Sequence, residues 1–316
     1  MSWMSHPYQD ILTQQLRALQ APLLEYGAPL RSRFAPSVTG QLHVGHLVHI
    51  WHLWTIMEAL GGKVRIRLED HDRQRYQPAF LDQLFEDLNW LGLWKHPVTL
   101  PDLWVQSERQ HVYAQHLHTL HLQQRSYACA CSRKQVAQRM VSSRAAWMHY
   151  DNACRDLSMP FQAQTHCWRA ALDLVAPEID HEVSLFGLDA SLRWYSRAHV
   201  SHPCYGDPSL YDRHGQYTYF FCAVVDDLLD NIGIVVRGLD LEHHTLKQLR
   251  LRKLFTQDSW VPLFVHHPLL PDPKASRKLS KSLLAKSLQA YRREGASPQG
   301  LLEQGLQQLY PDLSLC

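Results

Sequence analysis

Residues 30–46 read Leu-Arg-Ser-Arg-Phe-Ala-Pro-Ser-Val-Thr-Gly-Gln-Leu-His-Val-Gly-His, and this segment gives the clearest indication of the architecture. Its first six residues predict a short strand, which ends at Pro36 because proline cannot donate to a sheet ladder. A helix is expected from about residue 45 to residue 60, where two consecutive glycines stop it. The stretch therefore predicts a strand that leads into a helix with two histidines at its entrance.

The alternation of strands and helices continues after this unit. Residues 63–70 alternate apolar and charged side chains with a period of two, which predicts a half-buried strand with Glu69 at its end. A leucine-rich helix is expected near residues 81–91, and another from Ser107, where Gln110 completes a capping box. This order predicts an α/β fold with a parallel, Rossmann-type sheet.

The middle of the chain interrupts this pattern. Residues 127–203 combine cysteines, tryptophans and irregular spacing, which indicates an inserted subdomain. Beyond it, residues 217–225 and 232–237 are interpreted as buried strands of the second half of the sheet. Helices are expected at residues 282–293 and at residues 298–309, the latter with a proline at its first position.

These boundaries predict a catalytic core that an insertion splits in two, followed by a short helical C-terminal region. The expected segments are an N-terminal extension at 1–30, the first half of the catalytic domain at 31–126, a metal-binding insertion at 127–203, the second half of the catalytic domain at 204–265, and a Lys/Ser loop with C-terminal helices at 266–316.

Composition limits the class of protein. With 316 residues, of which 45% are hydrophobic, the chain can bury roughly 75% of its unfolded surface, as a globular protein does. The formal net charge of +2 excludes a strong overall basic field, so any contact with RNA must be local. The sequence has no cleavable leader pattern and no apolar run of about 18 residues. We therefore expect a monomeric, cytoplasmic protein without a membrane partner.

Two separated motifs carry the expected chemistry. The first places His43, Gly45 and His46 at a helix N-terminus, where orphan N–H groups and a partial positive charge suit a triphosphate. The second, Arg-Lys-Leu-Ser-Lys-Ser at residues 277–282, adds lysines and hydroxyl groups. Either motif alone is also compatible with packing histidines or solvated lysines. Together they predict ATP binding and adenylate formation, with His43, His46 and Lys281 as catalytic residues.

In this arrangement the chain resembles class I aminoacyl-tRNA synthetases, whose signatures end in His-Ile-Gly-His and Lys-Met-Ser-Lys-Ser. The resemblance covers about residues 33–281 and is closest to the glutamate-specific branch. The sequence departs from that branch at Val38, where proline is usual. The additional motifs that carry the resemblance are Arg33-Phe34-Ala35-Pro36-Ser37, Arg67-Leu68-Glu69-Asp70, Tyr219 before Val224-Val225-Asp226-Asp227, and Val236-Arg237-Gly238.

The residues agree with glutamate as the substrate. A carboxylate such as Glu69 can bind the ammonium of an amino acid, and Arg33 or Arg237 can bind its side-chain carboxylate. Tyr219 adds a hydroxyl donor, and a salt bridge from Arg237 to Asp240 is the alternative. The resemblance implies ATP with Mg²⁺ as a substrate. The implied glutamate-binding residues are Arg33, Phe34, Ala35, Pro36, Ser37, Glu69, Tyr219 and Arg237, and the implied ATP-binding residues are His43, Gly45, His46, Asp240, Lys278, Ser280 and Lys281.

A cysteine motif distinguishes subfamilies. Cys129 and Cys131 are followed by Tyr150 and Cys154, and three thiolates with a phenolate would close a four-coordinate, structural zinc site. The arrangement resembles the zinc site of glutamyl-queuosine tRNA(Asp) synthetases, which implies one structural Zn²⁺. His149 is a competing fourth ligand, and three unliganded cysteines are the alternative. The other cysteines are expected to be packing residues: Cys167, Cys204, Cys222 and Cys316.

The acceptor follows from length and resemblance. Only 34 residues follow Ser282, so we expect no large anticodon-binding region. The short form resembles enzymes that activate glutamate and transfer it to the queuosine base of tRNA(Asp), which implies the tRNA(Asp) anticodon arm, L-glutamate and ATP as partners. Arg133, Lys134 and Arg139 are expected to meet RNA phosphates. The alternatives are a minimal glutamyl-tRNA synthetase, a non-synthetase nucleotidyltransferase and an inactive RNA-binding paralogue.

Overall fold

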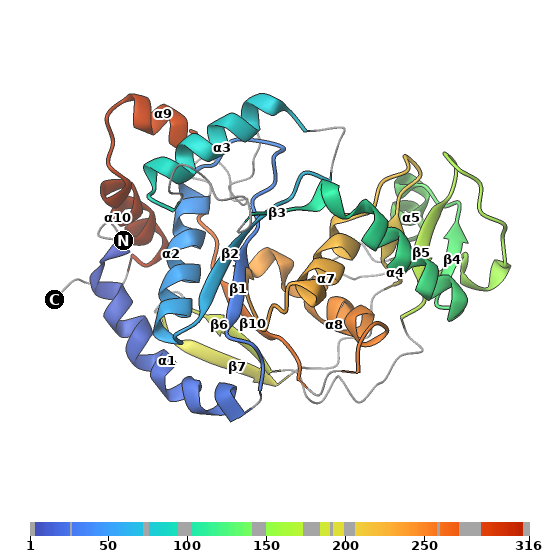
Figure 1. Ribbon diagram of the computed structural model, residues 1–316, viewed down its shortest axis with the longest axis horizontal. Coiled ribbons are helices and arrows are strands. Elements are labelled where there is room, and N and C mark those ends of the chain that lie inside the picture. The colour runs from blue at the N-terminus through green and yellow to red at the C-terminus, as the bar shows by residue number, and fades with distance from the viewer. Residues whose placement is uncertain are drawn as a thin grey trace.

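Helices and strands alternate along most of the chain (Figure 1). The computed structural model describes residues 4–25, 27–71, 76–93, 103–140, 150–172, 184–189, 192–198, 206–257, 260–271 and 286–311. None of the helices in these ranges has the length and apolar character that crossing a membrane requires.

The first half of the chain forms a parallel three-stranded sheet. Strand β1 (Arg31–Phe34) pairs with β2 (Lys63–Leu68), and β2 pairs with β3 (Leu103–Val105). Helix α2 (Val44–Ala59) connects β1 to β2, and helix α3 (Pro78–Trp90) lies between β2 and β3 in the chain. The strands predicted at 30–35 and 63–70, and the helices predicted after each of them, are confirmed.

A second sheet continues beside β1. It consists of β6 (Ser184–Leu188), β7 (Trp194–Ala198), β9 (Ile234–Gly238) and β10 (Leu263–His267) in the order β7-β6-β10-β9, and only β6 and β7 are antiparallel. Strands β1 and β9 are neighbours, because the N–H of Gly233 donates to the carbonyl of Arg31 at 3.1 Å. In open α/β folds, ligands bind outside the carboxyl ends of such strands, where the strand order reverses.

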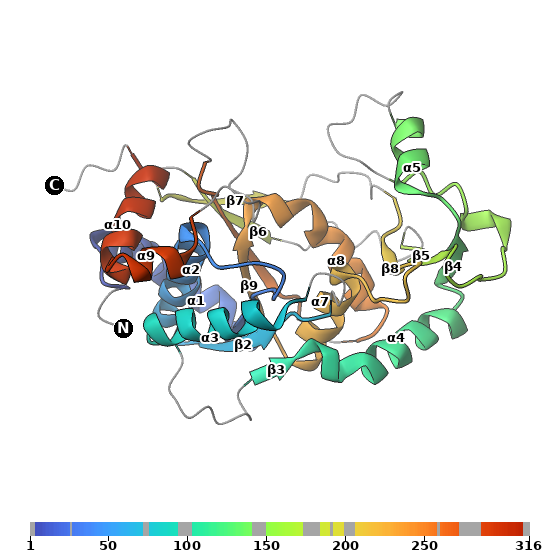
Figure 2. The ribbon, with the colours of Figure 1, turned by 90° about the horizontal axis from the view of Figure 1, so that it is seen from above.

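Helices from both ends of the chain cover α2. Helix α1 (Pro7–Glu25) and helix α10 (Pro298–Leu309) pack against α2, while α9 (Leu288–Arg293) lies against α3 (Figures 1 and 2). The side chains of α2 are apolar on most sides, and Trp51 is fully buried in the main core. The predicted helix at 298–309 is confirmed, and Ser297 caps it by accepting the N–H of Gly300.

The insertion is a separate antiparallel sheet. Its strands are β4 (Ser126–Cys129), β5 (Cys167–Ala170) and β8 (Ser209–Tyr211), with β5 in the middle. Helix α4 (Gln110–Leu122) leads into it from the short 3₁₀ helix η3 (Gln106–Arg109), and α5 (Arg133–Met140) and the 3₁₀ turn η4 (Arg155–Leu157) belong to it. The sheet lies at the end of the molecule opposite α10 (Figure 2).

The insertion differs from its expected boundaries of 127–203. Strand β8 extends it to Tyr211, whereas β6 and β7 lie within the expected range but join the second parallel sheet. The sequence did not reveal to which sheets these strands belong, because the partners of β6 and β8 lie far away along the chain. Sheet membership is a non-local property that strand patterning does not encode.

Two local predictions are wrong. Residues 217–225 were expected to be a strand, but helix α7 (Tyr219–Leu229) occupies most of this run, with Thr218 as its N-cap. A short apolar run that is buried on all sides has no period that separates strand from helix. The capping box at Ser107 is also absent, because the Ser107 N–H binds Asp70 Oδ1 at 2.8 Å and α4 begins only at Gln110.

The remaining elements surround the second sheet. Helix α7 packs on α8 (Thr245–Lys253), and the 3₁₀ helix η5 (Leu239–His244) connects β9 to α8. The predicted strand at 232–237 is confirmed as β9. The helix expected at 282–293 begins at Leu288 in the structure, with Ser287 as N-cap, and residues 282–285 lie outside the described residues.

Candidate functional site

The entrance of helix α2 is built by its two histidines. His43 is the N-cap residue, and its Nδ1 accepts the N–H of Gly45 at 3.1 Å. In return, the Nδ1 of His46 accepts the N–H of His43 at 3.1 Å, so the side chains form a capping box. A neutral imidazole that accepts at Nδ1 carries its proton on Nε2. Each ring therefore has an Nε2–H donor at a helix N-terminus, a place that favours anions.

Gly45 is required by this arrangement. A Cβ atom at this position would lie 2.8 Å from Cε1 and 3.0 Å from Nδ1 of His43. A side chain would therefore push the His43 ring out of its capping position. The rings of His43 and His46 lie 4.0 Å apart, so a shift of one ring displaces the other.

The chain after the second motif is fixed to the same helix entrance. The N–H of Leu288 donates to the carbonyl of Leu42 at 2.8 Å, and Ser287 forms a β-bridge with His43. Asp240 lies in η5, directly after β9. The other residues predicted for ATP lie outside the described residues: Lys278, Ser280 and Lys281.

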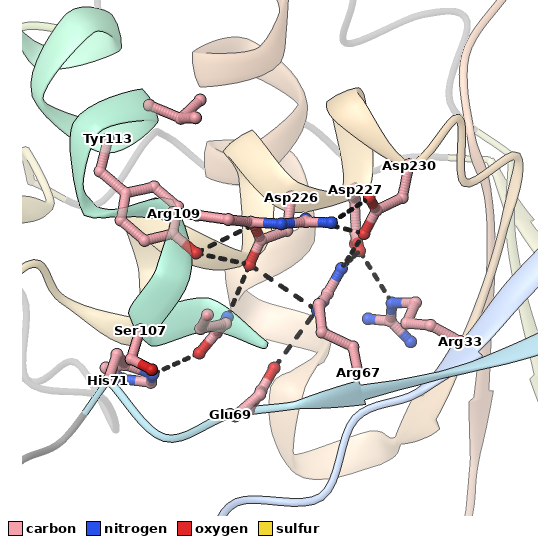
Figure 3. Close-up of polar contacts among 12 residues, drawn as sticks. Arg33, Arg67, Glu69, His71, Ser107, Arg109, Tyr113, Asp226, Asp227 and Asp230 are labelled. Carbon is pink, nitrogen blue, oxygen red and sulfur yellow. Dashed lines mark hydrogen bonds and ion pairs between the residues drawn. The ribbon is translucent and has the colours of Figure 1, made fainter. Parts of the chain in front are cut away.

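Arg33 is oriented by a carboxylate of helix α7 (Figure 3). Its Nε donates to Asp227 Oδ1 at 3.0 Å, and the side chain is largely buried. Its terminal nitrogens make no hydrogen bond within the described part of the chain. Asp227 thus holds the guanidinium in place while the fork keeps its capacity to bind a carboxylate.

Glu69 lies beside the loop that follows β1. Its N–H donates to the Pro36 carbonyl at 3.1 Å, and the backbone of Ser37 pairs with it in a parallel bridge. Its carboxylate is buried, and Nη2 of Arg67 is 3.7 Å away. Burial raises the pKa of Glu69, and the charge of Arg67 opposes this shift. A bound ammonium would stabilise the charged form further, so the position suits the amino group of a substrate.

Arg237 is a buried cation with neutral partners. Its guanidinium is 5% exposed and donates to Gln248 at 2.6 Å, to Thr245 at 2.5 Å and to His266 at 3.3 Å. Burial lowers the pKa of Arg237 to about 10. Among its contacts with described residues there is no salt bridge, and the alternative partner Asp240 is not a hydrogen-bond acceptor for it. A buried cation in such surroundings favours an anionic ligand.

Tyr219 lies near these side chains, because their charges shift its pKa. Burial raises its pKa, and the nearby charge of Glu69 acts in the same direction, while Arg237 and Arg33 oppose it. The phenol is therefore protonated and can donate a hydrogen bond. The structure thus brings together four residues predicted to bind glutamate. They are Arg33 of β1, Glu69 after β2, Arg237 of β9 and Tyr219 at the start of α7. Phe34 differs, because its side chain is 2% exposed and packs in the core, so only its backbone borders the site.

A charge network beneath the site was missed by sequence reasoning (Figure 3). Arg67 is fully buried, with Nη1 2.7 Å from Asp227 and 3.5 Å from Asp230. Arg109 lies 2.9 Å from Asp226 and 2.7 Å from Asp230. Two features of the sequence could have indicated this network: the acidic pair Asp226-Asp227 at the end of an apolar run, and Arg67 within the alternating strand. Pairing across such sequence separations is not visible in local patterns.

Three cysteines gather in the insertion. The Sγ atoms of Cys129, Cys131 and Cys154 lie within 4.8 Å of one another. The Tyr150 hydroxyl lies 3.3 Å from the Sγ of Cys129 and 4.0 Å from that of Cys131. A tetrahedral zinc with Zn–S distances of about 2.3 Å requires sulfur atoms roughly 3.8 Å apart, so these side chains fit such an ion.

Cys167 and Cys222, which were expected to be packing residues, are both buried in hydrophobic clusters. Cys167 faces Cys129 across the β4–β5 pair and packs against the cluster, and Cys222 is buried in α7. Arg139, expected to meet RNA phosphates, forms an exposed ion pair with Asp151. His149, Cys204 and Cys316 lie outside the described residues.

A cleft separates the insertion from α7 and α8. Its volume is about 1020 Å³, and Tyr219 and His71 line it at the side of the amino-acid site. The other walls carry an excess of positive side chains, which are Arg133, Arg169, Arg213 and Lys247. Such a channel suits a polyanion that reaches the site from outside.

The comparisons with known proteins agree with this geometry. The family described as tRNA synthetases class I (E and Q), catalytic domain, matches residues 29–309. The chain belongs to this family. The fold of the family is also seen in the glutamate-tRNA synthetase from Elizabethkingia anophelis, which has a TM-score of 0.64 and 22% identity. That match covers 88% of this chain and 61% of the solved chain.

Three relatives from the synthetase family carry two different names. A glutamyl-Q tRNA(Asp) synthetase from Rhodobacter capsulatus is 33% identical over 84% of this chain and 96% of its own length. A protein of the same name from Thiobacillus denitrificans is 34% identical and is covered over 84% of its length. A glutamate–tRNA ligase from Francisella tularensis is 29% identical, and the match covers 55% of that protein.

Proposed function

We propose that the protein activates L-glutamate with ATP and transfers the glutamyl group to the queuosine base in the anticodon of tRNA(Asp). The relatives from Rhodobacter capsulatus and Thiobacillus denitrificans, which carry glutamyl-Q tRNA(Asp) synthetase as their name, support this proposal over most of both chains. The geometry supports each of its two chemical steps.

The first step forms an adenylate. An oxygen of the glutamate α-carboxylate attacks the α-phosphorus of ATP, a new P–O bond forms, and pyrophosphate leaves with the electrons of the broken P–O bond. The Nε2–H groups of His43 and His46 would stabilise the negative charge on the phosphate oxygens. Lys278, Ser280 and Lys281 would add dispersed positive charge, Asp240 would bind the ribose, and Mg²⁺ would enter with the triphosphate.

The choice of glutamate rests on one observation, the buried guanidinium of Arg237 with only neutral hydrogen-bond partners. An arginine in this state gains most from a carboxylate, and the oriented fork of Arg33 and the hydroxyl of Tyr219 can bind the same group. Glutamine would place an amide there and leave a cation poorly paired. Glu69 would bind the substrate ammonium.

The second step transfers the glutamyl group. A hydroxyl of the cyclopentenediol of queuosine attacks the carbonyl carbon of the adenylate and loses its proton, an ester C–O bond forms, and AMP leaves with the electrons of the broken bond between that carbon and the phosphate oxygen. The basic cleft between the insertion and α7 would guide the anticodon arm, because its positive side chains can meet RNA phosphates and Tyr219 is among the residues that line it.

We further propose that Cys129, Cys131, Tyr150 and Cys154 hold one structural zinc ion. Three sulfur atoms and a phenol oxygen at the observed separations provide four ligands, which leaves no open position for a reacting water. When bound, the ion would fix β4 to the segment that follows α5, and thereby one wall of the basic cleft.

Two measurements test the proposed function. ATP–pyrophosphate exchange should proceed with glutamate in the absence of tRNA, and exchange supported by glutamine or aspartate instead would refute the amino-acid assignment. Labelled glutamate should then enter queuosine-containing tRNA(Asp), but not the same tRNA with guanine in that position, even when the 3′ end is blocked. Preferential charging of tRNA(Glu) at its 3′ end would show a minimal glutamyl-tRNA synthetase.

A further inference from the structure

Three imidazoles and a phenol form a continuous chain behind the candidate site. Tyr310 is the residue that directly follows α10, and its hydroxyl lies 2.6 Å from Nε2 of His52 on α2. The His52 ring stacks on His267 at the end of β10, with centroids 4.6 Å apart and planes inclined by 3°. Nε2 of His267 lies 2.9 Å from Nδ1 of His49, one turn before His52 on α2.

The hydrogen-bond partners fix the proton on each ring. Nδ1 of His52 lies 2.8 Å from the carbonyl of Val48, and Nδ1 of His267 lies 2.8 Å from the carbonyl of Pro268. A carbonyl can only accept, so both Nδ1 atoms carry a proton and both Nε2 atoms accept when the rings are neutral. The donor to Nε2 of His267 must then be the Nδ1–H of His49. All three rings are thus assigned the Nδ1–H tautomer, and Tyr310 donates to His52.

The surroundings keep these rings neutral. Burial lowers the pKa of His267 to about 4, and it lowers the pKa of His52 well below its ordinary value, with the neighbouring His267 acting in the same direction. Burial likewise lowers the pKa of His49, and the charge of Arg33 contributes. The assigned tautomers therefore apply at neutral pH.

This series of side chains ends at the amino-acid site. The His49 ring lies 5.9 Å from the Phe34 ring, and Phe34 follows Arg33 directly on β1. Within the described part of the chain, the His49 ring makes a single hydrogen bond, which joins it to His267. This hydrogen bond holds the His49 ring in its position next to the end of β1. A shift of this ring would move Phe34 and with it the guanidinium of Arg33.

We propose that His49 is a positioning residue for the glutamate site, held by His267 and, through the stacked ring of His52, by the docking of Tyr310. This proposal rests on the proposed function, because it assigns the effect of His49 to the Arg33 side of the amino-acid site. It predicts that the C-terminal helix contributes to substrate affinity without touching the substrate.

The tautomers provide a test that is independent of activity. Two-dimensional ¹H–¹⁵N spectra of imidazole-labelled protein at neutral pH should show His49, His52 and His267 as Nδ1–H tautomers. His116 on α4 is an internal reference, because its Nδ1 lies 2.9 Å from the Val112 carbonyl in the same arrangement as His52. Tyr310→Phe should shift the Nε2 resonance of His52 and leave that of His116 unchanged. Nε2–H tautomers at His49 or His267 would overturn the proposal.

Kinetics of ATP–pyrophosphate exchange test the positioning role. His49→Ala should raise the KM for glutamate about tenfold, the equivalent of one hydrogen bond, with little change in the KM for ATP. His49→Asn restores a donor near the Nδ1 position and should recover most of the affinity. His116→Ala is the matched control and should leave both KM values unchanged. Equal effects of His49→Ala and His49→Asn, or no effect of either, would overturn the proposal.

A further comparison separates this proposal from the proposed function. If the wild-type protein shows no glutamate-dependent exchange, the function is wrong, while the ¹⁵N spectra still decide the hydrogen bonds of the three rings. If exchange is normal and His49→Ala does not fold, Tyr310→Phe removes a single oxygen and should raise the KM for glutamate roughly two- to threefold. An unchanged KM in that variant would overturn the link to α10.

Discussion

Among single residues, Gly45 is critical for the entrance of α2. The His43 ring fills the space that a side chain at position 45 would need. Gly45→Ala should displace the His43 ring, because the new Cβ would lie 2.8 Å from Cε1 of that ring. The rate of ATP–pyrophosphate exchange should fall by roughly 10- to 100-fold, as expected when one preorganised donor is displaced.

The control for this substitution is Gly300→Ala in the first turn of α10, where a Cβ would meet only the Ser297 Oγ at 3.2 Å. That variant should retain activity. If Gly45→Ala exchanges pyrophosphate at the wild-type rate, the capping geometry of His43 is not part of catalysis.

Two buried arginines should respond in opposite ways to the same substitution. Arg237→Met should reduce glutamate-dependent exchange by roughly 10² to 10³ while leaving the melting temperature unchanged or higher, because it removes a buried cation without a carboxylate partner. Arg67→Met should lower stability by about 3–5 kcal/mol, since it leaves the carboxylates around it uncompensated. Thermal unfolding and exchange assays on both variants decide this. A large loss of stability in Arg237→Met would show that its role is structural.

Residue positions were easier to predict than residue partners. The end of β1 was located from Pro36 and that of β2 from hydrophobic alternation, so Glu69 was placed correctly at a strand end. Nothing local indicated that Asp227 would orient Arg33 or that the hydrogen-bond partners of Arg237 would all be neutral. These partners come from α7, α8 and β10, and the register between distant elements depends on the packing of the whole core.

At the scale of elements, the contact between α3 and α9 contains a buried carboxylate that links stability to pH. Asp87 on α3 is 1% exposed, and burial raises its pKa from 3.8 to about 6, although Arg292 on α9 opposes the shift. The folded state therefore binds a proton more tightly than the unfolded chain. The stabilisation from protonated Asp87 is complete below pH 3.8 and is lost as the pH rises through about 6.

This linkage predicts the behaviour of Asp87→Asn. Between pH 7 and pH 5 the wild-type protein should gain free energy of unfolding from this group, on the order of 1–3 kcal/mol, and the variant should lack that gain. Asp82→Asn on the exposed side of α3 is the control and should follow the wild type. Urea unfolding at several pH values measures the difference, and identical pH profiles for Asp87→Asn and the wild type would contradict the assignment.

Helix α7 shows why element type was harder to predict than element position. Its residues 220–226 are all buried, so the run lacks the polar positions that reveal a period. The side chain of Thr218 accepts the N–H of Phe221 and starts the helix, but a single threonine before an apolar run is a weak signal. By contrast, α10 has a serine cap, a proline and an apolar stripe, and its predicted bounds agree with the structure.

In the molecule as a whole, the cysteine cluster of the insertion is separate from the main core, although β5 and β8 share a third hydrophobic cluster with α7 and α8. The cysteine cluster packs with Tyr150 and Cys167, whereas the main core is formed around α2. Removing the proposed zinc with a chelator should therefore loosen the antiparallel sheet first, and a structural zinc contributes on the order of 10 kcal/mol to the folding of its own unit. Calorimetry should show a second, lower transition after chelation.

Cys131→Ser should reproduce this transition, while Cys222→Ser on α7 should not, because Cys222 is remote from the cluster and belongs to another core. Exchange of pyrophosphate without tRNA should persist in Cys131→Ser, and transfer to tRNA should decline. Metal analysis that finds no zinc in protein purified without chelator would refute the zinc proposal.

The hydrogen bond between Leu288 and Leu42 also affects how the protein folds during its synthesis. The N-terminal entrance of α2 is completed by a segment that follows it by 246 residues, counted from Leu42 to Leu288. At a synthesis rate of about 5–20 residues per second, a nascent chain waits roughly 12 to 50 s before this partner leaves the ribosome. During that interval α2, which is apolar on most sides, lacks the cover of α10. Slower translation of the last third of the gene should therefore favour capture of the nascent chain by chaperones more than slower translation of the first third.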